Sequence, residues 1–261
     1  MSINNRITQL TGTQYPIIQA PMGWIARAQL AAAVSNAGGL GVIETSSGEM
    51  DNIKREVALM RQMTDKPFAM NVALSYVRGT NIIDFVIDQG IKFVTTSSGS
   101  PSVCTKDFQA AGITVFHVVP TLEMALKALD AGVDGLVVEG GEGGGFKNPS
   151  PVSTMVLLPL IRSRCDVPII AAGGISDGLS MAAAFAMGAE GVQMGTRMVS
   201  AAESPVHQNW KDAIVAAADR PWRDLVSDRV AAQHLANRIA DGQHAFGIAS
   251  DRPADQHALG I

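Results

Sequence analysis

Two short glycine motifs contain the residues best suited to bind an anion. Gly173 and Gly174 end the apolar run PIIAAGG, and Gly195 and Thr196 end the run GVQMGT. A glycine has no side chain, so its backbone N–H groups can approach an anion closely, and Thr196 adds a hydroxyl donor. One such motif alone would indicate only a tight turn. Two in succession predict a phosphate site.

Few other residues are suited to acid–base chemistry. Glu139 precedes a glycine-rich segment, residues 141–145, and Glu142 lies within it; we interpret this segment as a loop that closes over substrate. A carboxylate in an apolar pocket can have a raised pKa and act as a base, or it can simply bond the loop backbone. His117 lies in the run TVFHVVP and is either a buried core histidine or an acid–base group. Lys147 either meets an anionic substrate, nucleotide or CoA phosphate, or is only solvated.

The composition excludes several classes of protein. The chain has 261 residues, 47% hydrophobic and 17% charged, with a formal net charge of −4. These values exclude disorder and predict a large core, and the mild acidity gives no basic surface for nucleic acid or membrane. Cys104 and Cys165 have no metal-binding or disulfide spacing, and no apolar stretch is long enough to span a membrane. We expect a soluble cytoplasmic protein that binds no metal and acts on a small molecule. A homo-oligomer is left open.

Eight short apolar runs, which we interpret as strands, alternate with amphipathic segments that are typical of helices. Most of the runs are continuously apolar, as parallel strands buried on both faces are. They begin at Pro16, Gly39, Pro67, Ile91, Thr114, Gly135, Pro168 and Gly191. This regularity predicts an α/β fold, a (β/α)8 TIM barrel in a single domain, with an open doubly wound sheet as the alternative.

We assign residues 1–220 to the barrel and residues 221–261 to a helical or irregular C-terminal extension of the same domain. Active sites of such barrels lie at the carboxyl ends of the strands, and phosphate often binds in the loops after the last two strands. Both glycine motifs occupy those two loops. The topology therefore supports the phosphate site independently of the glycine content.

Several of these segments carry a resemblance to a known family. They are PIIQAPM at 16–22, VSNAGGLG at 34–41, Asn71, VPIIAAGGISDG at 167–178 and AMGAEGVQMGTR at 186–197. Together they resemble the nitronate monooxygenase (2-nitropropane dioxygenase) family, and the flavin-dependent enoyl-ACP reductase II enzymes are similar to the same pattern. The resemblance extends from residue 16 to about residue 210, with its motifs in the family's order.

The resemblance implies an FMN-binding barrel. The phosphate would lie on the two glycine motifs, and the isoalloxazine ring would rest near the end of the first strand and the amide of Asn71. An apolar, tightly packed floor and an amide at the ring edge suit a flavin. The predicted cofactor-binding residues are Ala20, Pro21, Met22, Asn71, Gly145, Gly173, Gly174, Met194, Gly195 and Thr196.

The glycine-rich loop departs from the family pattern. The family usually reads E-G-x-E-x-G-G-H, with the histidine serving as the base or proton-handling group for the substrate, whereas this chain ends the motif with Phe146. A phenyl ring cannot transfer a proton, so removal of a proton from a neutral nitroalkane is in question. Oxidation of an already ionised nitronate needs no base. The predicted catalytic group is His117, Glu142, Phe146 and Lys147.

These observations predict an FMN-dependent oxidoreductase that resembles nitronate monooxygenase and oxidises a small carbanion-like substrate, an alkyl nitronate, with oxygen. Two alternatives stay open. One is a flavin reductase of an unsaturated carbonyl or acyl thioester that uses NAD(P)H as the reductant. The other is a flavin-binding partner subunit without catalytic activity.

Overall fold

The apolar runs form the strands of one parallel sheet in the computed structural model, which describes residues 3–76, 80–145 and 149–217. Their side chains are buried along nearly the whole length of every strand, which explains why the runs are continuously apolar. The strands are β1 (Ile17–Gln19), β2 (Gly41–Glu44), β3 (Phe68–Ala73), β4 (Phe93–Ser97), β5 (Thr114–Val119), β6 (Gly135–Glu139), β7 (Ile169–Ala172) and β8 (Gly191–Met194).

The sheet closes on itself. Its order is β1-β8-β7-β6-β5-β4-β3-β2, and a parallel bridge between Ile18 and Leu40 joins the two ends. At this seam the backbone N–H of Leu40 donates to the Ile17 carbonyl at 2.9 Å, and that of Gln19 donates to the Leu40 carbonyl at 3.0 Å. The predicted (β/α)8 barrel is confirmed, and the open doubly wound sheet is wrong.

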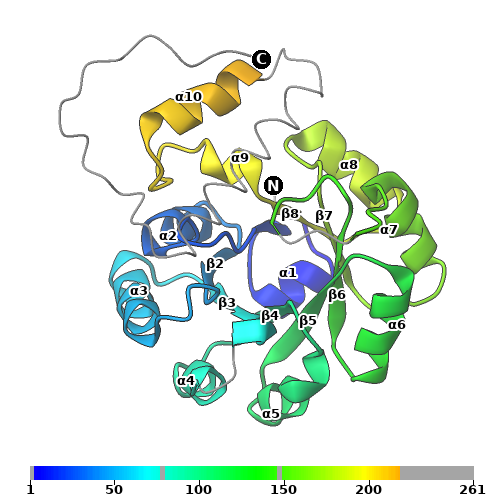
Figure 1. Ribbon diagram of the computed structural model, residues 1–261, viewed down its shortest axis with the longest axis horizontal. Helices are drawn as coiled ribbons and strands as arrows, with labels where there is room; N and C mark the ends of the chain where they lie inside the picture. Colours follow the sequence, from blue (N-terminus) through cyan, green and yellow to red (C-terminus); the bar gives the residue numbers. More distant parts are fainter. Residues whose placement is uncertain (1–2, 77–79, 146–148, 218–261) are drawn as a thin grey trace. The chain divides into compact units, whose positions relative to one another are not determined.

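Helices cover the outside of the barrel, as Figure 1 shows for α2 to α8. Phe108 on α5 and Leu157 on α7 are buried in the apolar cluster that joins the helices to the outer face of the sheet. The helices around the barrel are α2 (Ala28–Asn36), α3 (Met50–Met63), α4 (Ile82–Asp88), α5 (Thr105–Ala110), α6 (Leu122–Asp130), α7 (Thr154–Arg162) and α8 (Gly178–Ala186). Two further helices follow β8, α9 (Thr196–Val199) and α10 (Gln208–Ala216), and 3-10 turns occur at Leu74–Tyr76 and Pro101–Val103.

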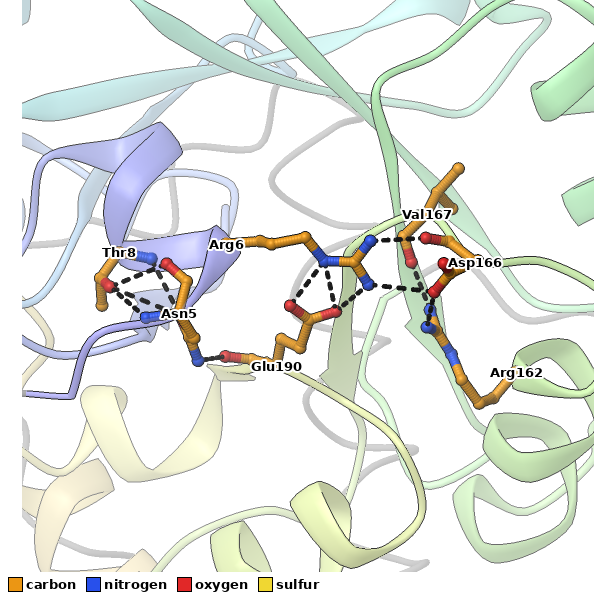
Figure 2. Close-up of polar contacts among 7 residues, drawn as sticks. All are labelled: Asn5, Arg6, Thr8, Arg162, Asp166, Val167 and Glu190. Carbon is orange, nitrogen blue, oxygen red and sulfur yellow. Dashed lines mark hydrogen bonds and ion pairs between the residues drawn. The ribbon is translucent and has the colours of Figure 1, made fainter.

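A short first helix, α1 (Arg6–Thr11), closes the amino-terminal end of the barrel. Ile7 is fully buried in the cluster inside the barrel. Figure 2 shows how the helix is held: Arg6 Nε donates to Glu190 Oε2 at 2.8 Å, and Arg6 Nη1 donates to the Asp166 carbonyl at 2.6 Å. Asn5 Nδ2 also donates to the Glu190 carbonyl at 2.6 Å. These contacts fix α1 across the amino-terminal end, and active sites of such barrels lie at the opposite, carboxyl end.

The compact unit that contains the barrel runs to Val215. The predicted extension, residues 221–261, lies outside the described residues, so its assignment stays a prediction. No helix in the described part of the chain is long and apolar enough to cross a membrane.

Candidate active site

Polar side chains line the inner face of the barrel at its carboxyl end. Glu44, Asn71 and Glu139 each lie two residues after a member of the inner apolar cluster, and side chains two apart on a strand share a face. Gln193 also faces inward, because Val192 and Met194 beside it both pack in the outer cluster. The mouth of the barrel is therefore polar above an apolar interior.

The loop after β7 requires its two glycines. Gly173 and Gly174 have φ values of +100° and +73°, in the left-handed region that favours glycine. A Cβ atom at Gly173 would lie 2.9 Å from Thr154 Oγ1 and 3.0 Å from the backbone N of Gly143, so the β6 and β7 loops pack tightly there. The glycines thus make the tight turn that the simpler interpretation of this motif predicts.

The same motifs also leave donors free. Among the described residues, the backbone N–H groups of Gly173, Gly174, Gly195 and Thr196 make no hydrogen bond to the protein. The last two lie where α9 begins, so its unsatisfied N–H groups add to the positive end of the helix dipole. This set of donors fits a phosphate.

The turn after β1 meets the turn after β8. A Cβ atom at Gly195 would lie 3.7 Å from Ala20 Cβ and 3.8 Å from Met22 Sδ, so both side chains lie against Gly195. The structure thus brings together the predicted ring-side residues Ala20 and Met22 and the predicted phosphate residue Gly195. Pro21, between them, is half-buried.

Two buried amides face the interior of the mouth. Asn71 is 2% exposed; its Nδ2 donates to Thr95 Oγ1 at 3.0 Å, and its Oδ1 accepts from Ser97 Oγ at 3.4 Å. Gln193 Oε1 is buried and has no hydrogen-bond partner in the described part of the chain. An unpaired buried oxygen is costly unless a ligand donates to it, which fits a flavin ring edge in this mouth. The sequence-based prediction omitted Gln193, although the inward alternation of β8 could have indicated it.

Met194 points the other way from Gln193. Its side chain is buried in the outer cluster, and its carbonyl accepts from the N–H of Ala20 at 2.9 Å. Only its backbone therefore borders the turn after β1. Its cofactor-binding role stays a prediction. The same holds for Gly145, which has a φ of +79° and where an added Cβ atom would meet no other described atom within 4 Å.

Glu142 bonds the start of α7. Its carboxylate accepts from the N–H of Thr154 at 2.9 Å, and the Thr154 hydroxyl lies 2.9 Å from the same oxygen. That hydroxyl is also 3.0 Å from the Gly173 carbonyl oxygen, so Glu142 and Thr154 tie the β6 loop to the β7 loop. This contact matches the alternative in which the carboxylate bonds the glycine loop. The role of Glu142 as a base stays a prediction.

His117 is not brought to the mouth. Val115 and Val119, which share its face of β5, pack in the cluster with the helices, so its ring faces outward. Its Nδ1 lies 2.7 Å from Thr96 Oγ1, and burial lowers the pKa of the imidazole to about 4. At neutral pH His117 is uncharged, and its ring lies on the opposite face of the sheet from the amides at the mouth.

The buried imidazole should make the protein less stable in acid. Because the pKa of His117 is about 4 in the folded state against 6.5 in the unfolded chain, unfolding takes up a proton between these values. The stabilisation is complete above pH 6.5 and is lost as the pH falls toward 4, by about 3 kcal/mol in the free energy of unfolding. Urea titrations across this range should show a shallower decline for His117→Gln. The matched change His207→Gln, at an exposed position, should leave the decline as in the wild type; an unchanged slope in His117→Gln would contradict the assignment.

The two other predicted catalytic residues, Phe146 and Lys147, lie outside the described residues. Among the residues that are described, no group of three or more His, Cys, Asp or Glu side chains could hold a metal ion.

Comparison with known proteins decides the family. The family model described as nitronate monooxygenase matches residues 4–82 and 76–223, most of the barrel. The chain belongs to the nitronate monooxygenase family. The resemblance drawn from the sequence motifs is thereby confirmed.

The relatives of this chain are named as different enzymes. It is 34% identical over 215 residues to the (3aS,4S,5R,7aS)-5-hydroxy-7a-methyl-1-oxo-octahydro-1H-indene-4-carboxyl-CoA dehydrogenase of Rhodococcus jostii, covering 82% of this chain and 60% of the relative. It is 30% identical to the nitronate monooxygenase of Pseudomonas aeruginosa, over 81% of this chain and 74% of that one. The solved structure of FabK from Thermotoga maritima has 39% identity and a TM-score of 0.79, over 84% of this chain and 70% of that one. The chain thus spans 60% of the Rhodococcus relative's length.

Proposed function

We propose that this chain is an FMN-dependent oxidoreductase that oxidises a small alkyl nitronate with oxygen. The observation that carries the proposal is the set of unpaired N–H groups in the two glycine loops, directly beside the Ala20–Met22 turn. Family membership supports the same cofactor. When bound, FMN supplies the redox chemistry, and the protein supplies binding, orientation and electrostatics.

Each part of the mouth then has a task. Gly173, Gly174, Gly195 and Thr196 bind the phosphate through backbone N–H groups. Asn71 and Gln193 offer amides to the ring edge. Ala20 and Met22 form an apolar wall that excludes water from the ring.

The proposed substrate follows from the acid–base groups. Of the predicted catalytic residues that the structure describes, His117 faces the helices and Glu142 bonds Thr154. Phe146 stands where the family pattern has its histidine. A nitronate is already ionised, so its oxidation needs no proton removed by the protein.

A second candidate is the NAD(P)H-dependent reduction of an unsaturated carbonyl or acyl thioester. It is favoured by the names of two relatives, the carboxyl-CoA dehydrogenases of Rhodococcus jostii and Mycobacterium tuberculosis, which are 34% and 31% identical to this chain. Lys147 would then bind a CoA phosphate. The two candidates share the FMN site and differ in what reduces the flavin.

An absorption spectrum of the purified protein tests the cofactor, with bands at roughly 370 and 450 nm expected for oxidised flavin. Anaerobic additions of propyl nitronate, NADH and NADPH then separate the candidates. We expect propyl nitronate to bleach the 450 nm band. Bleaching by NADH or NADPH alone would favour the thioester reductase, bleaching by none of the three would favour a non-catalytic flavin-binding subunit, and a colourless protein that takes up no added FMN would overturn the proposal.

A further inference from the structure

A buried carboxylate lies at the rim of the candidate flavin site and has no task in the function proposed above. Glu44 ends β2 on its inner face, beside Asn71 in the register of β2 and β3, and is 1% exposed. A carboxylate so deeply buried is stable only when it is paired and hydrogen-bonded.

Donors surround both oxygens of Glu44. Oε1 accepts from the backbone N–H of Trp24 at 3.3 Å and forms an ion pair with Arg27 Nη2 at 3.3 Å. Oε2 accepts from Ser46 Oγ at 2.6 Å and from the N–H of Ser47 at 3.2 Å. Glu44 therefore holds two turns at once, the one after β1 and the one after β2.

The Arg27 charge depends on this contact. Its side chain is 11% exposed, and within the described residues Nη1 and Nη2 make no hydrogen bond, so Glu44 is the ion-pair partner that the structure provides. The guanidinium also lies 4.9 Å from the ring centroid of Trp24. Trp24 itself has a φ of +62°, a strained conformation for a bulky residue that the surrounding contacts must maintain.

The turn held by Glu44 leads directly to the apolar wall of the site. The Met22 carbonyl accepts from the N–H groups of Ile25 at 3.0 Å and Ala26 at 2.8 Å, so Met22 and the Trp24 region form one closed turn. The N–H of Glu44 donates to the Ala26 carbonyl at 3.2 Å, which anchors the same turn a second time. At its other end, Met22 Sδ lies against Gly195.

We propose that Glu44 is a positioning residue for the flavin site, which fixes the Ala20–Met22 wall against Gly195 by holding the strained Trp24–Arg27 turn. The inference rests on the proposed FMN function and adds a residue whose two carboxylate oxygens are both occupied by the turns after β1 and β2. Glu44 acts through the turn, so its loss alters the shape of the wall rather than a contact to the cofactor.

The decisive variant is Glu44→Gln, which keeps the size of the side chain. Whichever way the amide turns, its NH2 group faces at least one group that can only donate, either the Trp24 N–H and Arg27 or the Ser47 N–H, and that contact is lost. We expect the Kd for FMN to rise about tenfold, with a shifted visible band of the bound flavin, in titrations at a temperature where circular dichroism shows wild-type helix content.

Glu56→Gln is the matched control. Glu56, on α3, accepts through Oε2 from the N–H of Ala28 at 3.0 Å, in the first turn of α2. It therefore bonds the helix that follows the Met22 turn, and not the turn itself. The control variant should bind FMN with the wild-type Kd and spectrum. If both variants lose some thermal stability yet keep the wild-type Kd and spectrum, Glu44 is only structural and the inference is wrong.

A double variant covers the case in which Glu44→Gln does not fold. Combining Glu44→Leu with Arg27→Met removes both members of the buried ion pair at once. Other proteins often tolerate the replacement of such a pair by apolar residues. The double variant should also show the raised Kd and the shifted band, and wild-type values would overturn the inference. If the wild-type protein itself binds no FMN, the proposed function fails, which is a result distinct from either of these.

Discussion

Replacing Gly174 with aspartate is expected to abolish the retention of FMN. The carboxylate would stand where the phosphate is proposed to bind, and like charges about 4 Å apart repel by about 4 kcal/mol at the effective dielectric of a partly exposed site. A Cβ atom at Gly174 would lie 3.4 Å from Glu142 Cβ, so the Cβ atom itself meets no clash, but the φ of +73° strains any side chain at this position. We expect the Kd for FMN to rise by on the order of 100-fold or more, measured by fluorescence titration and by the flavin-to-protein absorbance ratio.

Gly174→Asn separates charge from shape. Asparagine has the size of aspartate, and both tolerate the φ of +73° better than other side chains do. The asparagine variant should therefore retain much more flavin than the aspartate variant. Full flavin content in Gly174→Asp would show that the phosphate lies elsewhere, and equal loss in both variants would show that backbone strain, not charge, is responsible.

The barrel could be predicted because its signals are local and repeated. Each strand is an apolar run, since both of its faces are buried, and glycine motifs mark the turns after β7 and β8. The same regularity places Asn71 on the inner face and brings Ala20 and Met22 to Gly195. Strand order and the closing bridge at Ile18 and Leu40 follow from the number of units rather than from any single residue.

Side-chain partners could not be predicted, because they depend on which face of a strand a residue occupies and on what lies opposite. His117 is one residue away from an inward position, and this difference turns its ring toward Thr96. Glu142 accepts a hydrogen bond from Thr154, twelve positions further along the chain, only when the β6 loop folds back on α7. Glu44 and Arg27 look like ordinary surface charges in the sequence, and the pairing becomes visible only where the turns after β1 and β2 meet.

Phe146, which the sequence resemblance matches to the family's histidine, leads to the other large expected effect. Phe146→His should give the protein activity on a neutral nitroalkane, because an imidazole in the role that the resemblance assigns to this position can remove the proton that a phenyl ring cannot. General base catalysis typically contributes on the order of 100-fold or more, so oxygen consumption with nitroethane should rise by about that factor. The gain should appear as the pH rises through about 6.5, where an ordinary histidine becomes neutral and able to accept a proton.

The pre-ionised substrate is the internal control. With propyl nitronate, the wild type and Phe146→His should differ little, because no proton has to be removed, and Phe146→Asn should gain nothing on nitroethane, because its amide is polar but not basic. A wild type that already oxidises nitroethane as fast as propyl nitronate would show that another group serves as the base. A Phe146→His variant that binds FMN but gains no activity on nitroethane would show that more than the missing imidazole separates this chain from the family pattern, and would shift the preference to the acyl thioester.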